Sequence, residues 1–344
     1  MSDYALHLGD CLDILPTLAD NSIDLIATDP PYYKVKAESW DRQWDTPAAF
    51  LEWLDKVLSE LYRVLKPNGS LYLFASPQMA ARVEVLIGER FNVLQRICWA
   101  KGGADRKDGG RWAQASKEAL RSFFPQTEYI IFAEHYGAEG YAKGEAGYGA
   151  KCDELRGFVF EPLRAYLDGE RLQAGLSKPD VDRAWQQWKG GGNGGMSSHW
   201  FSPSQWALPT AENYQWLRET FSRLNHGGEY LRREYEELRR EYEELRRPFT
   251  VSAEVPYTDV WTFPTVQAYR GKHPTEKPVA LMRHIISASS RPGAVVLDPF
   301  AGSGTTGVAA RELGRSFVGI EKDAGYFEMA DRRIRHYQPL LEDV

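Results

Sequence analysis

Cysteine is scarce in this sequence, and the few thiols are scattered. Only Cys11, Cys98 and Cys152 are present, and their spacing fits neither a disulfide framework nor a metal site. No apolar run approaches the roughly 20 residues of a membrane-spanning helix, and the N-terminus lacks a signal-peptide pattern. We therefore predict a cytoplasmic protein in a reducing setting, with no metal and no membrane attachment.

An excess of basic residues is also missing. The formal net charge is −6, which excludes a protein coated with basic surface but leaves room for a local basic groove that binds nucleic acid. Hydrophobic residues make up 43% and charged residues 26%, as in ordinary globular proteins. A chain of 344 residues predicts either one large domain with a substantial insertion or two domains.

The two ends of the chain carry the pattern of an α/β domain. Nearly continuous apolar segments predict buried strands, and amphipathic segments between them predict helices. The expected strands are 4–10, 23–27, 70–75, 92–100, 128–133, 294–298 and 315–321, and the expected helices are 11–18, 50–65, 79–87, 278–289 and 306–313. Pro67 and Gly69 are expected to end the helix 50–65. This alternation predicts a parallel sheet covered by helices on both faces.

The middle of the chain, residues 134–260, is richer in glycine, tryptophan and charge. Segments 163–172 and 178–188 predict two helices around a short glycine-containing turn, with Ser177 as the cap of the second. This outline fits a helix-turn-helix motif, and it fits a generic helical hairpin equally well. A heptad repeat within 229–247 predicts a charged helix with one apolar seam. We expect that seam to pack within its own subunit, with a dimer contact as the alternative, so both monomer and homodimer stay open.

One short segment suggests a site for a planar base. Asp29, Pro30, Pro31 and Tyr32 follow the predicted strand 23–27. Proline lacks a backbone N–H, so the carbonyl groups of this turn stay free to accept hydrogen bonds. A carboxylate, a free carbonyl and an aromatic ring can together hold a base that bears an exocyclic amino group. A strand-ending turn with a solvated aspartate explains the same residues.

A second segment is a glycine-rich loop after the strand 294–298. Gly302, Gly304 and Gly307 have the spacing of a dinucleotide-binding loop, and Glu321 follows about 20 residues after the first of them. The usual interpretation of this pattern is a nicotinamide enzyme, in which the acid binds ribose hydroxyls.

Four acids that end predicted strands change this interpretation. Asp10, Asp29, Asp298 and Glu321 would line one edge of the sheet if both ends of the chain contribute neighbouring strands. An acidic crevice is a poor place for a pyrophosphate. It suits an adenosine ligand that is cationic, and S-adenosyl-L-methionine is such a ligand.

Three motifs together resemble those of the DNA amino-methyltransferases. They are the Asp29–Tyr32 turn, the loop 298–306 and the segment 273–278, which reads His-Pro-Thr-Glu-Lys-Pro. Their order is similar to that of the β group, a circular permutation in which the catalytic motif precedes the cofactor motif. The resemblance covers residues 4–133 and 260–335.

The resemblance implies a Rossmann-like methyltransferase sheet of seven strands, the last antiparallel, with an inserted and mainly helical target-recognition region. On this basis residues 1–133 form the catalytic half, 134–260 the target-recognition insertion and 261–344 the cofactor-binding half. It also implies base flipping. The Asp-Pro-Pro-Tyr form is typical of N6-adenine enzymes, whereas serine in the first place is commoner in N4-cytosine enzymes. An N4-cytosine or RNA acceptor is the alternative, and a non-catalytic binding module is disfavoured because both motifs are intact.

Roles follow for the individual residues. Asp29 and the carbonyl of Pro30 are expected to accept the two amino hydrogens of the flipped base, with Pro31 shaping the turn and Tyr32 stacking on the base. Glu321 is expected at the ribose, Asp10 at the adenine amino group, and Lys277 at the methionine carboxylate. The full set predicted to bind S-adenosyl-L-methionine is Asp10, Cys11, His273, Thr275, Lys277, Asp298, Pro299, Phe300, Ala301, Gly302, Ser303, Gly304, Thr305, Glu321 and Lys322.

Double-stranded DNA is the expected partner. Basic residues follow the strand 92–100, and we predict phosphate contacts from Lys101, Arg106, Lys107 and Arg111. A solvated loop is the alternative. The family also implies a prokaryotic or phage-encoded protein, with a cognate restriction endonuclease as a second partner in a restriction-modification pair.

Overall fold

The computed structural model describes residues 4–33, 35, 41–102, 126–135, 160–191, 195–203, 206–251, 258–267, 269 and 272–336. The chain divides into two compact units, one of residues 1–135 and 248–344 and one of residues 136–247. The second border lies before the expected residue 260, because the chain from Pro248 onward packs on the sheet. Phe249 stacks on Phe132 at 5.7 Å between ring centroids, and the Thr250 N–H donates to the Ala288 carbonyl.

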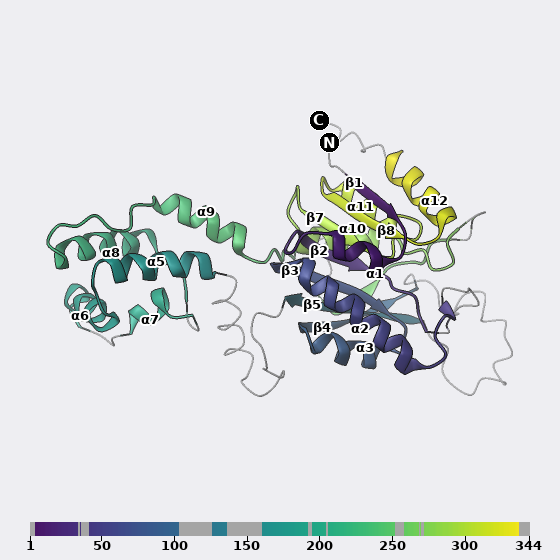
Figure 1. Ribbon diagram of the computed structural model, residues 1–344, viewed down its shortest axis with the longest axis horizontal. Helices are drawn as coiled ribbons and strands as arrows, with labels where there is room; N and C mark the ends of the chain where they lie inside the picture. Colours follow the sequence, from purple (N-terminus) through teal and green to yellow (C-terminus); the bar gives the residue numbers. More distant parts are fainter. Residues whose placement is uncertain are drawn as a thin grey trace. The chain divides into compact units, whose positions relative to one another are not determined.

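The first unit is built on one sheet of eight strands (Figure 1). Its order is β1-β8-β7-β2-β3-β5-β4-β6. Among these strands only β5 runs against the rest. The strands are β1 (Tyr4–Leu8), β2 (Ile23–Thr28), β3 (Leu65–Ala75), β4 (Phe91–Ala100), β5 (Thr127–His135), β6 (Val260–Thr262), β7 (Val295–Asp298) and β8 (Ser316–Glu321).

The predicted Rossmann-like α/β architecture is confirmed, and two details of it are corrected. The sheet has eight strands instead of seven, because the three-residue strand β6 pairs with β4 at one edge. The antiparallel strand is β5, which lies between β3 and β4, and the last strand of the chain is parallel to its neighbours. A strand of three residues is too short to show a period of two, and a sequence pattern does not reveal strand pairing.

Helices cover both faces of this sheet, as predicted. Residues of α1 (Cys11–Ile14), α2 (Pro47–Val64) and α3 (Ala80–Gly88) share one apolar core with Ile26 of β2. Residues of α10 (Val279–Ser289), α11 (Thr305–Glu312) and α12 (Ala324–Arg335) share the other core with Leu25. Successive side chains of a strand point to opposite faces, so neighbouring residues of β2 serve the two cores.

The end of helix α2 differs from the prediction. The helix begins at Pro47, where Thr46 caps it by accepting from the Ala49 N–H, and it ends at Val64. Strand β3 follows at once, so Pro67 and Gly69 lie inside a strand instead of ending a helix. The pairing of β2 with β3 shifts register at this point, and such a bulge accommodates a proline that cannot donate to the ladder.

The second unit is helical. It contains α5 (Glu161–Gln173), α6 (Lys178–Lys189), α7 (Met196–Phe201), α8 (Ala211–Leu224) and α9 (Tyr235–Leu245). Its core is rich in aromatic rings, among them Trp200, Trp206 and Phe221. Ser177 caps α6 as predicted and forms a capping box with Asp180. None of the helices among the described residues has the length and hydropathy needed to cross a bilayer.

The heptad segment forms a shorter helix than the predicted 229–247. Leu231 has a φ of +53°, a left-handed conformation that no α-helix continues through, and α9 starts only at Tyr235. Leu238 is fully buried, and Tyr242 stacks on Phe160 beside α5, with 4.6 Å between ring centroids. The apolar seam of this helix therefore packs within its own chain.

Candidate active site

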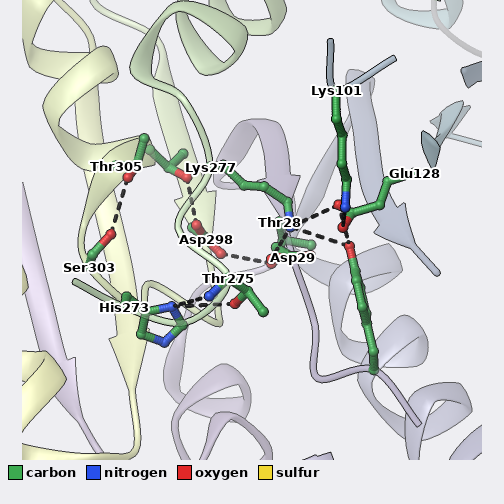
Figure 2. A network of polar contacts seen from close by, with 12 residues as sticks. Thr28, Asp29, Lys101, Glu128, His273, Thr275, Lys277, Asp298, Ser303 and Thr305 are labelled. Carbon is green, nitrogen blue, oxygen red and sulfur yellow. Dashed lines mark hydrogen bonds and ion pairs between the residues drawn. The ribbon is translucent and has the colours of Figure 1, made fainter. Parts of the chain in front are cut away.

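The two ends of the chain meet in the middle of the sheet. Strands β2 and β7 lie side by side, with Ile26 opposite Leu297. From β2 the chain goes on to β3 on one side, and from β7 it goes on to β8 on the other. Ligands of open α/β sheets bind at such a reversal, beyond the carboxyl ends of the strands. The Thr28 hydroxyl donates to Asp298 Oδ1 at 2.7 Å and ties the two strand ends together (Figure 2).

A cavity of about 360 Å³ opens at this edge. That volume lies in the range of small-molecule binding sites. Its walls bring together the N-terminal turn and the C-terminal glycine loop, as the sequence predicted. It is lined by Gly9, Asp10, Cys11, Asp29, Pro30, Pro31, Tyr32, Gln43, Trp53, His273, Thr275, Pro299, Phe300, Gly302, Ile320, Glu321, Lys322, Asp323 and Tyr326.

The glycine loop needs its glycines for two different reasons. Gly302 has a φ of +52°, and a Cβ there would lie 3.4 Å from the His273 ring. Gly304 has a φ of +78°, and a Cβ there would lie 2.9 Å from the Cα of Ala330 in α12. Gly304 is also the N-cap residue of α11, so it lies where the loop joins that helix. The backbone can thus approach both a ligand and the packed helix closely.

Two acids flank this loop on the cavity wall. Glu321 accepts the Gly302 N–H through Oε2 at 2.7 Å and the Asp323 N–H through Oε1 at 2.8 Å, and burial raises its pKa. Asp10 caps α1 by accepting the Leu12 N–H at 3.0 Å and pairs with Lys322 at 2.9 Å. Burial opposes ionisation of Asp10, yet Lys322 and the N–H of Leu12 lower its pKa.

Three further predicted residues share the wall in uncharged form. Cys11 is buried, and burial together with the charge of Asp10 raises the pKa of its thiol to about 12. Burial and the nearby Lys277 lower the pKa of His273 to about 4. The Thr275 hydroxyl lies 3.3 Å from His273 Nδ1. Near neutral pH these groups leave the wall polar without adding charge.

Asp298 lies deeper than expected of a cofactor ligand. It is only 4% exposed and accepts hydrogen bonds from Thr28, from Thr306 at 2.6 Å and from the Phe300 N–H at 3.1 Å. Burial raises its pKa to about 6. It lines a neighbouring cavity of about 40 Å³, together with Ala301, Ser303 and Thr305. These contacts favour the structural role for Asp298.

The predicted catalytic turn surrounds a lysine. Lys277 Nζ lies 2.6 Å from Asp29 Oδ2, 3.2 Å from Glu128 Oε2 and 3.3 Å from the Tyr32 hydroxyl (Figure 2). The Tyr32 hydroxyl donates in turn to Glu128 Oε2 at 3.2 Å. The three hydrogens of the ammonium group are thereby matched by three acceptors. In this arrangement Lys277 forms an ion pair with Asp29 and has no hydrogen left to donate to a methionine carboxylate.

Asp29 keeps one oxygen unused. Its Oδ2 binds Lys277, whereas its Oδ1 is buried and has no hydrogen-bond partner in the part of the chain that the structure describes. Burial raises the pKa of Asp29, with Lys277 opposing this effect and Glu128 adding to it. Buried acceptors are nearly always paired, so this unpaired oxygen of a residue that lines the cavity calls for a functional explanation.

Glu128 is a site residue that the sequence analysis missed. It is the second residue of β5, and it contacts Tyr32, Lys277 and Lys101. Burial alone would raise its pKa, but Lys277 and Lys101 hold it at about 2. The sequence feature that could have identified Glu128 is a single acidic residue at the start of an otherwise apolar predicted strand.

Of the four basic residues predicted to contact DNA, only Lys101 lies among the described residues. Its ammonium group binds Glu128 and lies over the ring of Trp99, 5.6 Å from the centroid. It therefore contacts the cluster formed by Asp29, Tyr32, Glu128 and Lys277 through Glu128. Arg106, Lys107 and Arg111 lie outside the described residues.

Comparison with known families decides the class of protein. The family model N6/N4 methyltransferase, described as DNA methylase, matches residues 23–332. The chain belongs to this DNA methylase family. As a member of the N6/N4 DNA methylases it is an enzyme whose substrate is DNA.

Two curated relatives of this DNA methylase cover nearly its whole length. One is the DNA adenine methyltransferase YhdJ of Escherichia coli K12, with 28% identity over 332 residues, 95% of this chain and 81% of the relative. The other is the type II methyltransferase M2.MboI of Moraxella bovis, with 21% identity over 359 residues, 99% of this chain and 91% of the relative.

Two solved structures share the fold of this DNA methylase. The PvuII DNA methyltransferase, which is cytosine-N4-specific, has a TM-score of 0.53 and 13% identity over 100% of this chain and 89% of its own. The protein TTHA0409 of Thermus thermophilus has a TM-score of 0.51 and 20% identity over 98% of this chain and 96% of its own.

Proposed function

We propose that this DNA methylase transfers a methyl group from S-adenosyl-L-methionine to the N6 amino group of adenine in double-stranded DNA. The observation that carries the proposal is that Asp29, whose Oδ1 is buried and unpaired in the described structure, lines a cavity whose wall also contains Gly302. An acceptor in this position suits a ligand that donates hydrogen, and an exocyclic amino group is such a donor.

The chemistry asked of the turn is modest. The lone pair of an exocyclic amine is delocalised into the ring, so the amine is a weak nucleophile. Asp29 Oδ1 and the Pro30 carbonyl would each accept one amino hydrogen, which favours a pyramidal nitrogen and directs its lone pair. The rate gain then comes from positioning and from preorganised charge, without a covalent enzyme intermediate. Tyr32 would pack on the flipped base.

The residues of the cavity fit S-adenosyl-L-methionine. This cofactor supplies a methyl group bonded to a positively charged sulfur. The acids Asp10 and Glu321 on the wall favour a cation, and the glycine loop lets the backbone approach it. Glu321 would accept from the ribose hydroxyls, Asp10 from the adenine amino group, and Thr275 with His273 would face the methionine end.

Adenine is favoured over cytosine by two observations. The turn reads Asp-Pro-Pro-Tyr, and the relative YhdJ, which is named a DNA adenine methyltransferase, aligns with 95% of this chain. The cytosine-N4-specific PvuII enzyme shares the fold at 13% identity, which carries no information on the base. Cytosine N4 presents the same amino-group chemistry, so it is the alternative that a product analysis has to exclude.

We further propose a division of labour along the chain. The catalytic turn precedes the glycine loop, which is the order of the β group, and both belong to the first unit. The helical unit 136–247 would contact the target sequence. M2.MboI is named a type II methyltransferase, which supports a cognate restriction endonuclease as a partner.

The proposal is tested by incubating the protein with labelled S-adenosyl-L-methionine and double-stranded DNA, followed by nucleoside analysis. We expect label in N6-methyl-2′-deoxyadenosine. Label in N4-methylcytosine would correct the base, and an unlabelled product would refute the proposed function.

Asp29→Asn provides the residue-level test. The amide keeps the size of the side chain but loses the charge that accepts the amino hydrogen, so we expect the transfer rate to fall by about 10²–10³-fold or more. Cofactor affinity, measured by calorimetry, should stay within about threefold because the oxygen lost faces the base. Glu52→Gln, on the exposed surface of α2, is the matched control and should leave the rate unchanged. An Asp29→Asn protein with full activity would contradict the assignment.

A further inference from the structure

The ammonium group of Lys277 is enclosed on every side that the structure describes. Its side chain is 7% exposed, and the rings of Tyr32, Phe74 and Trp99 lie 5.1–5.8 Å from it. Burial would lower its pKa, yet Asp29 and Glu128 raise it above the ordinary value. Lys277 is thus a fixed positive charge, held by aromatic faces and two carboxylates.

The second carboxylate has a balancing effect. Glu128 shares Lys277 with Asp29 and has Lys101 as a partner of its own. The cluster therefore contains two carboxylates and two ammonium groups, in the order Asp29, Lys277, Glu128, Lys101 (Figure 2). Removing Lys277 or Glu128 leaves the cluster around Asp29 with an uncompensated charge. Water screens such a charge poorly because the cluster is buried.

We propose that Lys277 and Glu128 are positioning residues for methyl transfer, which together set the charge and the orientation of Asp29 so that its Oδ1 meets the target amine. This inference rests on the proposed function. Lys277 binds Oδ2 at 2.6 Å and leaves Oδ1 without a partner among the described residues. Glu128 also binds Lys277, so the positive charge of the lysine is shared between two carboxylates. Asp29 is therefore not fully neutralised and can still accept a hydrogen bond.

The charged groups that face Asp29 come from several elements. Lys277 and His273 lie on the segment before α10, Glu128 on β5 and Asp298 at the end of β7, with Tyr32 in the same turn and Lys101 after β4. Asp298 is already bound by three donors, and His273 is neutral near pH 7. Lys277 and Glu128 are therefore the two groups whose removal changes Asp29 most directly.

The two variants are expected to act in opposite directions. In Lys277→Met the Asp29 carboxylate loses its counter-ion, takes up a proton more readily and becomes a poorer acceptor. The acid limb of the pH–rate profile should move up by about one pH unit or more, which is about a tenfold loss of rate below the midpoint. In Glu128→Gln a neighbouring negative charge is lost, so the acid limb should move down.

The experiment measures single-turnover methyl transfer to DNA between about pH 5 and pH 9 for the wild type and both variants. Lys66→Met is the matched control, because Lys66 forms a comparable 2.7 Å pair with Asp24 at the opposite end of β2. We expect its profile to coincide with that of the wild type. Equal loss of rate at every pH, or shifts in one direction for both variants, would overturn the inference.

A second readout does not depend on activity. Carboxyl ¹³C NMR titration of aspartate-labelled protein, with the Asp29 signal assigned by its absence in Asp29→Asn, reports the pKa of Asp29 directly. It should rise in Lys277→Met and fall in Glu128→Gln. An unchanged Asp29 titration would overturn the inference even if the enzyme is active. A wild type that methylates no DNA would refute the proposed function instead, and the titration would still decide whether Lys277 and Glu128 control Asp29.

Discussion

Burial has a different consequence for each carboxylate at this site. Asp298 is surrounded by donors that carry no charge, and burial raises its pKa to about 6. Glu128 is also largely enclosed, with 13% of its side chain exposed, but two ammonium groups hold its pKa at about 2. The pKa values of these two acids therefore lie far apart. The charges of the surrounding residues, instead of the depth of burial, decide whether each acid is ionised.

The raised pKa of Asp298 predicts a specific dependence of stability on pH. Its ordinary pKa is 3.8, so the folded state binds a proton more readily than the unfolded state and loses stability as the pH rises from about 4 to above 6. Asp298→Asn removes this titration. The variant should gain stability relative to the wild type by up to about 3 kcal/mol at pH 7.5, and the gain should vanish near pH 4.

Urea unfolding at several pH values measures this difference. Asp20→Asn, at a site whose side chain is 69% exposed, is the control and should show little change. A variant of Asp298 that is less stable than the wild type by the same amount at every pH would show that lost hydrogen bonds to Thr28 and Thr306 outweigh the cost of the buried charge.

At this scale the sequence predicted part of the site. The sequence analysis selected Asp29, Tyr32, Gly302 and Glu321 because each ends or follows a recognisable strand and carries a chemistry that the turn or loop needs, and the structure places all four at one cavity. Glu128 and the inward direction of Lys277 were missed. The contacts of Lys277 with Asp29, Tyr32 and Glu128 join residues more than a hundred positions apart. No local sequence pattern encodes which charged groups will lie next to each other in the fold.

At the scale of the element, the glycine loop approaches α12 so closely that a side chain at residue 304 has no room. Gly304→Ala would place a methyl group 2.9 Å from the Ala330 Cα and force a left-handed φ on alanine. We expect a loss of unfolding free energy of roughly 2–4 kcal/mol, from backbone strain plus displaced packing. Cofactor affinity should fall with it, because the loop and helix move together.

Gly314 provides the matched control. Its φ is +68°, close to that of Gly304, but in the described structure no heavy atom lies within 4 Å of the position of its Cβ. Gly314→Ala should therefore cost only the backbone strain, about 1–2 kcal/mol, and leave cofactor binding intact. Thermal or urea unfolding compares the two variants. Equal losses would show that the approach of α12 does not constrain residue 304.

Helices and strands were predicted well where the segment is long enough to show a clear hydrophobic pattern. The amphipathic segment 50–65 became α2, and the buried runs became β2, β3, β7 and β8. The errors lie at ends and at short elements. Strand β3 extends back through Pro67 because a bulge accommodates it, and β6 has too few residues to show alternation.

At the scale of the whole molecule, the helical unit is one continuous insertion. The chain leaves the first unit after His135 and re-enters it at Pro248, and the ring of Phe249 packs on that of Phe132 in β5. The exit and the return therefore lie close together on the sheet. An insertion with neighbouring ends can be removed without stretching what remains.

We predict that a protein in which a short Gly/Ser linker replaces residues 136–247 folds and binds S-adenosyl-L-methionine. The cavity residues all belong to the first unit, so cofactor affinity should stay within about threefold of the full chain. Sequence-specific methylation should be lost, since the unit proposed to contact the target is gone. Calorimetry and methylation of a defined DNA library measure the two properties. An insoluble or non-binding product would show that the helical unit is needed to complete the first unit's fold.

The pairing of β1 with β8 sets the timing of assembly on the ribosome. Tyr4–Leu8 is made about 300 residues before its neighbour in the sheet, Ser316–Glu321. At translation rates of roughly 5–20 residues per second that interval is about 15–60 s. Throughout it the nascent chain holds the proposed catalytic turn without the complete pocket proposed for its cofactor. Methyl transfer by this polypeptide is then expected only after β8 has been made and has paired with β1.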